Sequence, residues 1–318
     1  SNARRASRRC MAEVARDYTA RDFLYPRYWP DWLALLFLRT VAALPLPLIW
    51  IIGGVLGTLL YYLMSERRHI TLTNIRACFP ELAPAQQRRL VHAHFRVFVQ
   101  AALATPISWW GSERRMKRLV RMSGKEYFDQ ALAARKPVIL LVAHFVAIEV
   151  AGMVLAPDYF MIDMYKRPKN LFFDWLIRTR RSRFGGLLVE RREGIKPVIR
   201  GLRKGGSFYY LSDQDQGRDG AVFAPFFGVP AATLTALGRL TQLTGAVVIP
   251  CFAKQLPWGK GYELIFQPAL ENFPTDDVLA DTTRMNKIIE DAVREMPEQY
   301  FWSHRRFKTR PEGEGPFY

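Results

Sequence analysis

The sequence contains little cysteine, and its few cysteines form no pattern. Only Cys10, Cys78 and Cys251 occur among 318 residues, and no two of them make a CxxC pair. An odd, scattered set of this kind predicts neither a disulfide framework nor a zinc site. A reducing compartment is therefore the expected environment.

Motifs of several common enzyme chemistries are also missing. The chain has no GxSxG, which excludes the nucleophile elbow of serine hydrolases. It has no GxGxxG after a strand, and the glycines at 201–206 lack the lysine-hydroxyl pair of a P-loop. Asp213 and Asp215 have the spacing of metal ligands, but Gly217 comes one residue early for a calcium loop and the twelfth-position Glu is missing. We predict no cofactor and no metal.

Acidic residues are in short supply. There are 29 of them against 46 Lys and Arg, which leaves a formal net charge of +17. Such a field favours nucleic acid, an anionic membrane surface, an acidic protein or a phosphorylated ligand, and does not choose among them. The hydrophobic share of 49% excludes a disordered tail protein and allows one large domain or two small ones.

Charged residues are scarcest between residues 32 and 64, where Arg39 is the only one. Leu46–Met64 is uncharged and just long enough to span a bilayer core of roughly 30 Å. We predict a membrane anchor at 32–64, spanning or half-inserted; a buried core hairpin is the alternative. Residues 1–31 are a basic lead-in, of which 1–3 resemble a purification-tag remnant, and 65–318 are expected to form the catalytic domain.

The rest of the chain alternates between short apolar runs and helical periodicity. This alternation predicts an α/β fold with a mainly parallel central sheet and flanking helices. Ser123-x-x-Glu126 is expected to cap a helix that runs to about residue 135. The other expected strands are 138–143, 159–164, 187–189, 207–211, 246–252 and 262–266, and the other expected helices are 86–110, 145–156, 170–184, 193–204, 231–243 and 276–296.

One ionisable residue stands at the end of the most apolar strand. Val138–Val142 is an unbroken apolar run, His144 follows it, and Glu149 comes five residues later in a helical segment. With His144 at the strand end, Glu149 in the second turn can reach back to the ring, as general-base catalysis requires. The alternative is a buried histidine whose ring a local carboxylate satisfies for packing alone.

Further polar clusters follow other predicted strands. Ligands gather at the carboxyl ends of strands in parallel α/β sheets, so these clusters are expected to converge with His144. Four arginines end the helix 170–184, more than the helix dipole requires, and guanidinium groups suit phosphate. The candidate phosphate-binding residues are Lys166, Arg167, Arg178, Arg180 and Arg181, and the candidate pocket residues of the third cluster are Asp213, Gln214, Asp215 and Gly217.

His144-x4-Glu149 resembles the His-x4-(Asp/Glu) block of the glycerolipid acyltransferase superfamily, in the form found in the lauroyl/myristoyl acyltransferases that finish lipid A. Further blocks of that family are similar and occur in order over about two thirds of the chain. They are Arg67-Arg68, Asn74-Ile75-Arg76-Ala77-Cys78-Phe79-Pro80-Glu81, Asp213-Gln214-Asp215 with Gly217, Pro225–Ala232 with Phe227 and Pro230, and Gly245–Pro250.

The resemblance implies a glycerol-phosphate acyltransferase-like fold and direct acyl transfer without an acyl-enzyme. The implied donor is an acidic acyl carrier protein. The implied acceptor is a lipid A precursor that bears Kdo sugars, at the cytoplasmic side of the bacterial inner membrane. His144 would be the base, Glu149 would orient it, and Arg181 or its neighbour Arg180 would hold an acceptor phosphate. Phe227 and Pro230 would belong to the substrate pocket. Nucleic acid is not an expected partner.

Two rival functions remain open on the sequence. The nearest is an acyltransferase for another phospholipid or an amino lipid. A rival of another class is a non-catalytic basic adaptor at a membrane surface or on nucleic acid. The adaptor accounts for the charge but gives no reason for His144 and Glu149 at a strand end.

Overall fold

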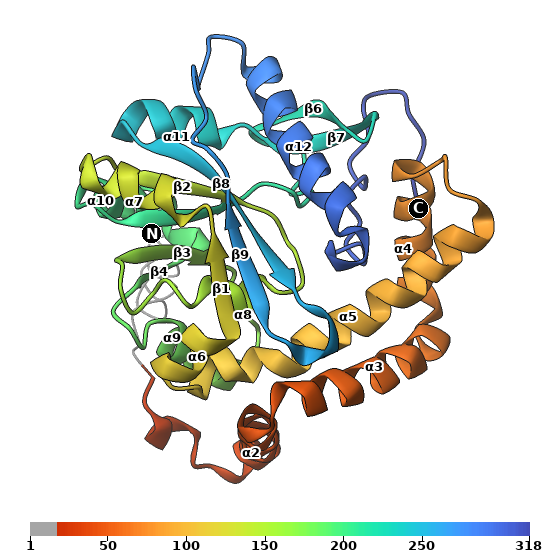
Figure 1. Cartoon of the computed structure of the whole chain (residues 1–318), viewed down its shortest axis with the longest axis vertical. Helices are drawn as coiled ribbons and strands as arrows, with labels where there is room; N and C mark the ends of the chain where they lie inside the picture. The colour runs from red at the N-terminus through yellow and green to blue at the C-terminus, as the bar shows by residue number, and fades with distance from the viewer. Residues whose placement is uncertain (1–17) are drawn as a thin grey trace, which may run out of the picture.

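The computed structural model describes residues 18–318, so the part of the predicted lead-in that covers 1–17 lies outside the described residues. Its centre is a seven-stranded sheet of order β1-β9-β8-β2-β5-β3-β4 (Figure 1), in which only the β8–β9 pair is antiparallel. The predicted α/β class with a mainly parallel sheet is confirmed. The strands are β1 Val120–Ser123, β2 Val138–Val142, β3 Met161–Tyr165, β4 Leu187–Glu190, β5 Ser207–Leu211, β8 Val247–Gln255 and β9 Tyr262–Phe266.

Strand β2 lies in the middle of this sheet and is fully buried on both faces. Its alternate residues point into two separate hydrophobic cores, as the period of two in a strand requires. Ile139 and Leu141 belong to one core, whereas Val138, Leu140 and Val142 belong to the other. The helices that follow β1 along the chain and flank the sheet are α7 Lys125–Ala133, α8 Ile148–Gly152, α9 Leu171–Arg181, α10 Lys196–Arg203, α11 Ala236–Thr244 and α12 Val278–Glu295.

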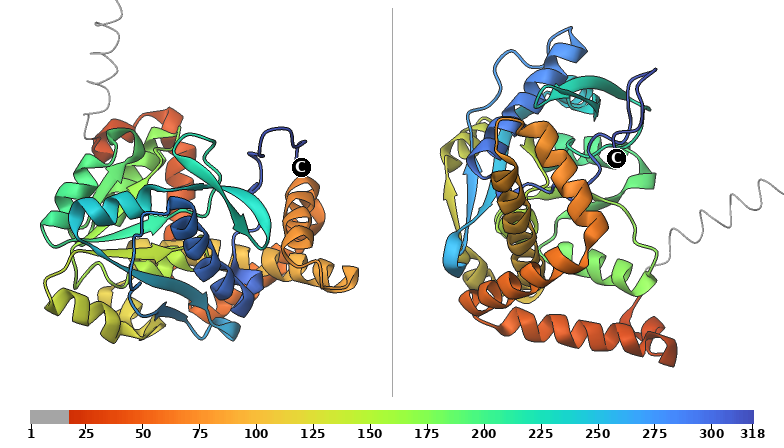
Figure 2. Two further views of the ribbon diagram at one scale, coloured as in Figure 1. Left: turned by 90° about the horizontal axis from the view of Figure 1, so that it is seen from above. Right: turned by 90° about the vertical axis from the view of Figure 1, so that its right-hand side faces the viewer.

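The N-terminal third is helical. Helices α2 (Trp29–Ala43) and α3 (Leu46–Leu63) lie at one edge of the molecule, and α3 runs beside the long helix α5 (Pro84–Trp110) (Figures 1 and 2). In the part of the chain that the structure describes, α3 is the one helix long and apolar enough to cross a membrane, with a mean hydropathy of 1.9. Helix α4 (Ser65–Cys78) joins α3 to α5.

Glycines allow α3 and α5 to approach backbone to backbone. A Cβ atom added at Gly53 would lie 2.6 Å from Gln100 Cα, and one added at Gly57 would lie 2.6 Å from Arg96 Cα. Both distances are shorter than real Cβ contacts, so any side chain at these positions would push the two helices apart. Helix α3 is therefore packed along its length against a helix that carries charged residues.

Three local predictions are wrong. Ser123 ends strand β1, and its hydroxyl donates to Glu263 Oε1 (2.6 Å) instead of capping a helix. The helix expected at 145–156 is only the short α8. The first four residues of the helix expected at 231–243 belong to strand β7, which pairs antiparallel with β6 in a separate hairpin that packs on α12. The hairpin strands are β6 Ala221–Phe226 and β7 Val229–Leu234.

Candidate active site

His144 follows the buried end of β2, and a carboxylate from the loop after another strand holds it. The Asp213 carboxylate accepts two hydrogen bonds from His144, one from the ring Nδ1 (2.6 Å) and one from the backbone N–H (2.8 Å). Asp213 comes shortly after β5, and β5 is the parallel neighbour of β2, with Val142 opposite Leu211. Parallel pairing thus brings the two strand ends side by side.

The Asp213 contact sets the tautomer of the neutral imidazole. An ionised carboxylate only accepts hydrogen bonds, so in the neutral ring Nδ1 carries the proton and Nε2 has the free lone pair. The Asp213 side chain is 1% exposed, whereas that of His144 is 29% exposed. Burial by itself would raise the pKa of the Asp213 carboxyl, but the charge and hydrogen bonds of His144 hold that pKa below its usual value. Among the described residues, Nε2 has no hydrogen-bond partner and is available as a base.

Glu149 does not occupy the position predicted for it. Its carboxylate forms a two-pronged ion pair with Arg181, Oε1 to Nε at 3.0 Å and Oε2 to Nη2 at 2.5 Å, and Oε1 also accepts from Trp109 Nε1 (3.2 Å). The prediction that Glu149 orients the ring is therefore corrected, because Asp213 is the partner of Nδ1. Helix α8 begins only at Ile148, which puts Glu149 in its first turn, facing α9.

Arg181 is held between two carboxylates. Its Nη1 donates to Asp163 Oδ2 (3.2 Å), in addition to the pair with Glu149. Burial would lower the pKa of Arg181, but the two carboxylates raise it above its usual value. Burial raises the pKa of Asp163, and the charge of Glu149 raises it further, whereas the charges of Arg181 and His144 lower it. A phosphate at Arg181 would have to share the guanidinium with both carboxylates.

The other predicted phosphate-binding residues do not all gather at this position. Arg167 pairs with Asp174 (3.1 Å), whose side chain is 1% exposed and also accepts from Tyr165 Oη (2.9 Å). Arg180 lies over the Trp110 ring at 5.3 Å. Burial lowers the pKa of Arg180, and so does the charge of Arg39. Lys166 is exposed, and Arg178 lies in the last turn of α9 with Arg180 and Arg181.

The Asp213–Gly217 block has two different tasks. Asp213 holds His144, whereas the Asp215 carboxylate accepts from the backbone N–H of Thr309 (2.6 Å), from its hydroxyl (2.7 Å) and from the Gly217 N–H (3.0 Å). Asp215 therefore anchors a segment beyond α12. Gln214, between the two, lines a small cavity beside His144.

The predicted pocket residues Phe227 and Pro230 lie in the β6–β7 hairpin. Phe227 and Gly228 both have positive φ (52° and 76°), the conformation of a two-residue turn between twisted strands. The Phe227 N–H donates to Glu290 Oε1 (2.6 Å) on α12, and the Pro230 carbonyl accepts from Arg310 Nη1 (2.9 Å). These contacts fix the hairpin against α12 and the segment that follows it.

Sequence reasoning missed the segment after α12. The small cavity beside His144 draws many of its walls from residues 300–306, in which Arg306 is 2% exposed. The signal available in the sequence was the run Tyr-Phe-Trp-Ser-His-Arg-Arg, which mixes aromatic and basic residues beyond the last helix. The cavity is lined by Asn74, His144, Asp213, Gln214, Tyr300, Phe301, Trp302, His304 and Arg306.

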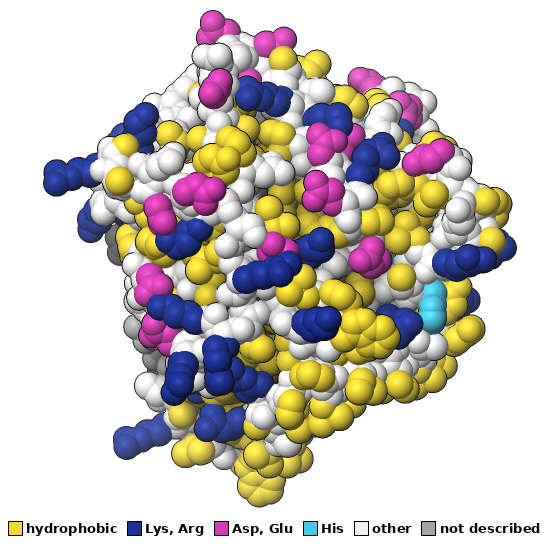
Figure 3. All heavy atoms as spheres, viewed as in Figure 1, with side chains coloured by type: hydrophobic (Ala, Val, Ile, Leu, Met, Phe, Trp, Pro, Cys, Tyr) yellow, Lys and Arg dark blue, Asp and Glu magenta, His cyan; other side chains and the backbone are white. Residues whose placement is uncertain are grey.

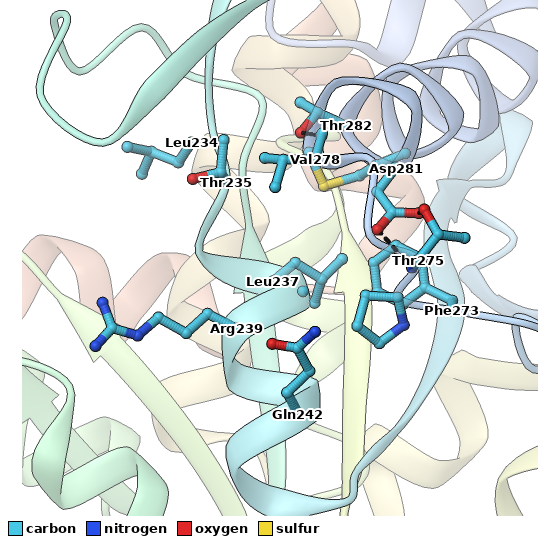
Figure 4. A pocket seen from close by; sticks show the side chains of 13 residues that line it. Leu234, Thr235, Leu237, Arg239, Gln242, Phe273, Thr275, Val278, Asp281 and Thr282 are labelled. Carbon is cyan, nitrogen blue, oxygen red and sulfur yellow. Dashed lines mark hydrogen bonds between the residues drawn. The ribbon is translucent and has the colours of Figure 1, made fainter.

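A larger cavity of about 370 Å³ lies between α11 and the start of α12 (Figure 4). Its labelled side chains come from the end of β7, from α11 and α12, and from the loops that precede these helices, with Leu237 and Phe273 among the apolar ones. None of the predicted site residues lines it. Met285 connects it to the site, because its sulfur accepts from the hydroxyl of Ser212 (3.2 Å), the residue before Asp213.

Comparison with known proteins identifies the family. Residues 18–309 match the family described as "Bacterial lipid A biosynthesis acyltransferase". The chain belongs to this family. It is 35% identical to the lipid A biosynthesis lauroyltransferase of Escherichia coli K12 over 91% of this chain and 95% of that protein. It is 34% identical to the lipid A biosynthesis myristoyltransferase of the same organism over 92% of this chain and 91% of that protein.

The resemblance stated from the sequence blocks is thereby confirmed, and so is an acyltransferase of lipid A biosynthesis as the kind of enzyme. Among solved structures, the 1-acyl-sn-glycerophosphate acyltransferase PlsC of Thermotoga maritima is similar over 78% of this chain and 98% of that one. A TM-score of 0.40 and 14% identity leave that likeness too weak to bear on the fold or the activity.

Proposed function

We propose that the chain transfers a fatty acyl group from an acyl carrier protein thioester to a hydroxyl group of a lipid A precursor, with His144 as general base. The observation that carries this proposal is the His144–Asp213 pair, which engages Nδ1 and leaves Nε2 without a hydrogen-bond partner among the described residues, on a ring that is 29% exposed. Nε2 takes the proton as the acceptor oxygen attacks the thioester carbonyl carbon. The tetrahedral intermediate then collapses, the carbon–sulfur bond breaks, and the thiolate leaves with the proton that the imidazolium returns.

Asp213 takes the orienting role in this mechanism. Its negative charge, 2.6 Å from Nδ1, favours the imidazolium that forms during attack. Glu149 and Arg181 are proposed to act as one unit next to the base, with Glu149 fixing the guanidinium. The Arg181 N–H groups that its carboxylate partners leave open are proposed to contact an acceptor phosphate.

The proposed location is the cytoplasmic face of the inner membrane. Of the 21 exposed large hydrophobic residues within residues 18–318, 15 lie between Leu24 and Met64. Most of these belong to α2 and α3, which lie at one edge of the molecule (Figure 2). Figure 3 shows hydrophobic side chains along this lower edge and a group of Lys and Arg side chains next to it. Apolar surface with adjacent cations fits the interface of an anionic bilayer.

Half-insertion fits this edge better than a span. The inner face of α3 is closed against α5 by Gly53 and Gly57, and Arg96 of α5 lies at that contact. If α3 spanned the bilayer, it would have to separate from α5 or draw the arginines of α5 into the hydrocarbon core. Either α3 would lose its packing partner or charged side chains would enter the lipid, which is costly. We therefore propose that α2 and α3 lie in the interface with their outer faces in the lipid.

Acyl transfer by the purified chain tests the function. Wild type and His144→Ala would be supplied with acyl carrier protein thioesters and a lipid A precursor, and products would be followed by mass spectrometry. We expect His144→Ala to lose about 10²–10⁴-fold in rate while keeping its melting temperature. Turnover close to wild type by a stably folded His144→Ala protein would refute the assignment. Acceptor panels that include lysophospholipids separate the lipid A reaction from acylation of another lipid.

A further inference from the structure

A buried polar cluster joins helices α4 and α5 to the segment 298–304 that follows α12. Asn74 of α4 is 0% exposed, and its Nδ2 donates to the carbonyls of both Trp302 (2.8 Å) and His304 (2.8 Å). Its Oδ1 accepts from the hydroxyl of Tyr318 (2.5 Å). Both N–H groups of the amide and its oxygen thus have partners, which a residue placed only for packing would not need.

A second side chain holds the same segment. His94 of α5 is 0% exposed, with Nδ1 3.0 Å from the Glu298 carbonyl and Nε2 3.1 Å from Ser303 Oγ. A carbonyl only accepts, so Nδ1 carries the proton and Nε2 accepts from the serine hydroxyl. Asn74 and His94 therefore fix the segment from two helices at once.

The segment held in this way touches the candidate base. The Phe301 N–H donates to the His144 carbonyl (3.0 Å), and the Val146 N–H donates to the Gln299 carbonyl (2.9 Å). The Tyr300 hydroxyl donates to the Asp213 carbonyl (3.3 Å). Backbone atoms of both members of the His144–Asp213 pair are therefore anchored on residues 299–301.

We propose that Asn74 is a positioning residue for the reaction: it fixes the segment 300–304, whose backbone in turn fixes His144 opposite Asp213. This inference rests on the proposed role of His144 as the base. Asn74 acts without contact between its amide and the reacting atoms, because its partners are the carbonyls of Trp302 and His304. This role would explain why the Asn74–Glu81 block begins with an asparagine, a residue that the proposed mechanism does not otherwise use.

The test compares Asn74→Ala with a matched core substitution on the same helix. Ile75 is also 0% exposed and belongs to the hydrophobic core, so Ile75→Val loosens packing without removing a hydrogen bond to 298–304. We expect Asn74→Ala to lower kcat by about tenfold to a hundredfold, with KM for the lipid acceptor changed less than about threefold. Ile75→Val should keep kcat per folded molecule. A folded Asn74→Ala protein with wild-type kcat, or an equal loss in Ile75→Val, overturns the inference.

A second readout reports on the base itself. In protein with ¹⁵N-labelled histidine, the His144 Nδ1 and Nε2 signals, assigned by their loss in His144→Asn, should shift in Asn74→Ala and stay in place in Ile75→Val. If Asn74→Ala does not fold, Tyr318→Phe replaces it, because it removes only one hydroxyl, which donates to the Asn74 amide and accepts from the Phe307 N–H (3.1 Å). A smaller loss of kcat with shifted His144 signals is then expected, and normal kcat with unshifted signals overturns the inference.

His144→Ala, measured alongside, separates the two levels of the proposal. If His144→Ala keeps its activity, the proposed function fails and the positioning role fails with it. If His144→Ala is inactive while folded Asn74→Ala is normal, only the positioning role fails.

Discussion

Asp213→Asn is the substitution that tests the site most directly. In the structure both carboxylate oxygens accept, one from His144 Nδ1 and one from its backbone N–H. An asparagine has one acceptor and one donor, so its NH₂ must face one of these two groups. If the NH₂ faces Nδ1, the ring proton must move to Nε2, and the base is lost. If the NH₂ faces the backbone N–H of His144, two donors face each other without an acceptor.

The expected loss is large in rate and modest in stability. Asparagine has nearly the same volume, so no cavity forms. The loss of the correct tautomer and of the charge that favours imidazolium should reduce kcat by about 10²–10⁴-fold. The mispaired buried group should lower the free energy of unfolding by about 1–3 kcal/mol.

The assay is the initial rate of acyl transfer, together with urea unfolding. Asp281→Asn is the matched control, because the Asp281 carboxylate is also buried and also accepts from a backbone N–H (2.8 Å) and a side chain (3.1 Å), both of Thr275. It should lose no more stability than Asp213→Asn, because the Thr275 hydroxyl can also accept from an amide, and little activity per folded molecule. Turnover of a folded Asp213→Asn protein within about threefold of wild type would refute the reasoning, since general-base catalysis contributes far more.

The dependence of folding stability on pH provides a second test of Asp213. The folded-state pKa of Asp213 lies below its usual value of 3.8, because His144 outweighs the effect of burial. A lowered folded pKa means that the ionised carboxylate contributes stability which is complete above about pH 5 and is lost as the pH falls through the lowered pKa. The stability difference between wild type and Asp213→Asn should therefore shrink as the pH falls below about 5.

Three further predictions concern the surroundings of the site. Arg181→Ala should lower the free energy of unfolding by about 1–3 kcal/mol in urea titrations, because two carboxylates lose their cation; unchanged stability would contradict the ion pairs. Gly57→Val should destabilise by about 1–3 kcal/mol through overpacking, whereas Gly54→Ala, whose nearest neighbours at 3.2 Å and beyond are side-chain atoms, should be tolerated; equal losses would rule out the close helix contact. Burial lowers the pKa of His94 to about 4 from an ordinary 6.5. The unfolded chain therefore binds a proton that the native one does not, so stability should fall by up to about 3 kcal/mol between pH 6.5 and 4. His94→Gln should flatten this slope, and a slope that persists would exclude His94 as its cause.

Local patterns in the sequence were sufficient for much of the fold. The apolar run 138–142 predicted a strand buried on both faces, and β2 is fully buried. The helical periodicity near residue 90 predicted α5, and the alternation of strands and helices predicted the α/β class. These features follow from the sequence because burial repeats with the period of each element.

Short segments were predicted less well. Residues 231–234 form the short run Ala-Ala-Thr-Leu, which suits a helix or a strand equally, and only pairing with β6 makes them part of β7. Ser123 has the pattern of a helix cap, but pairing of β1 with β9 places its hydroxyl beside Glu263. In both cases a partner distant in sequence outweighed a local preference.

The sequence by itself determined that a histidine ends the central strand, and the tertiary structure decided which carboxylate faces it. Asp213 is 69 residues from His144, and the two meet because β5 pairs with β2. Glu149, only five residues away, turns to Arg181 of α9 instead. The spacing within one segment limits what can touch, but the order of strands in the sheet selects what does touch. That order depends on contacts between distant segments, which no local pattern encodes.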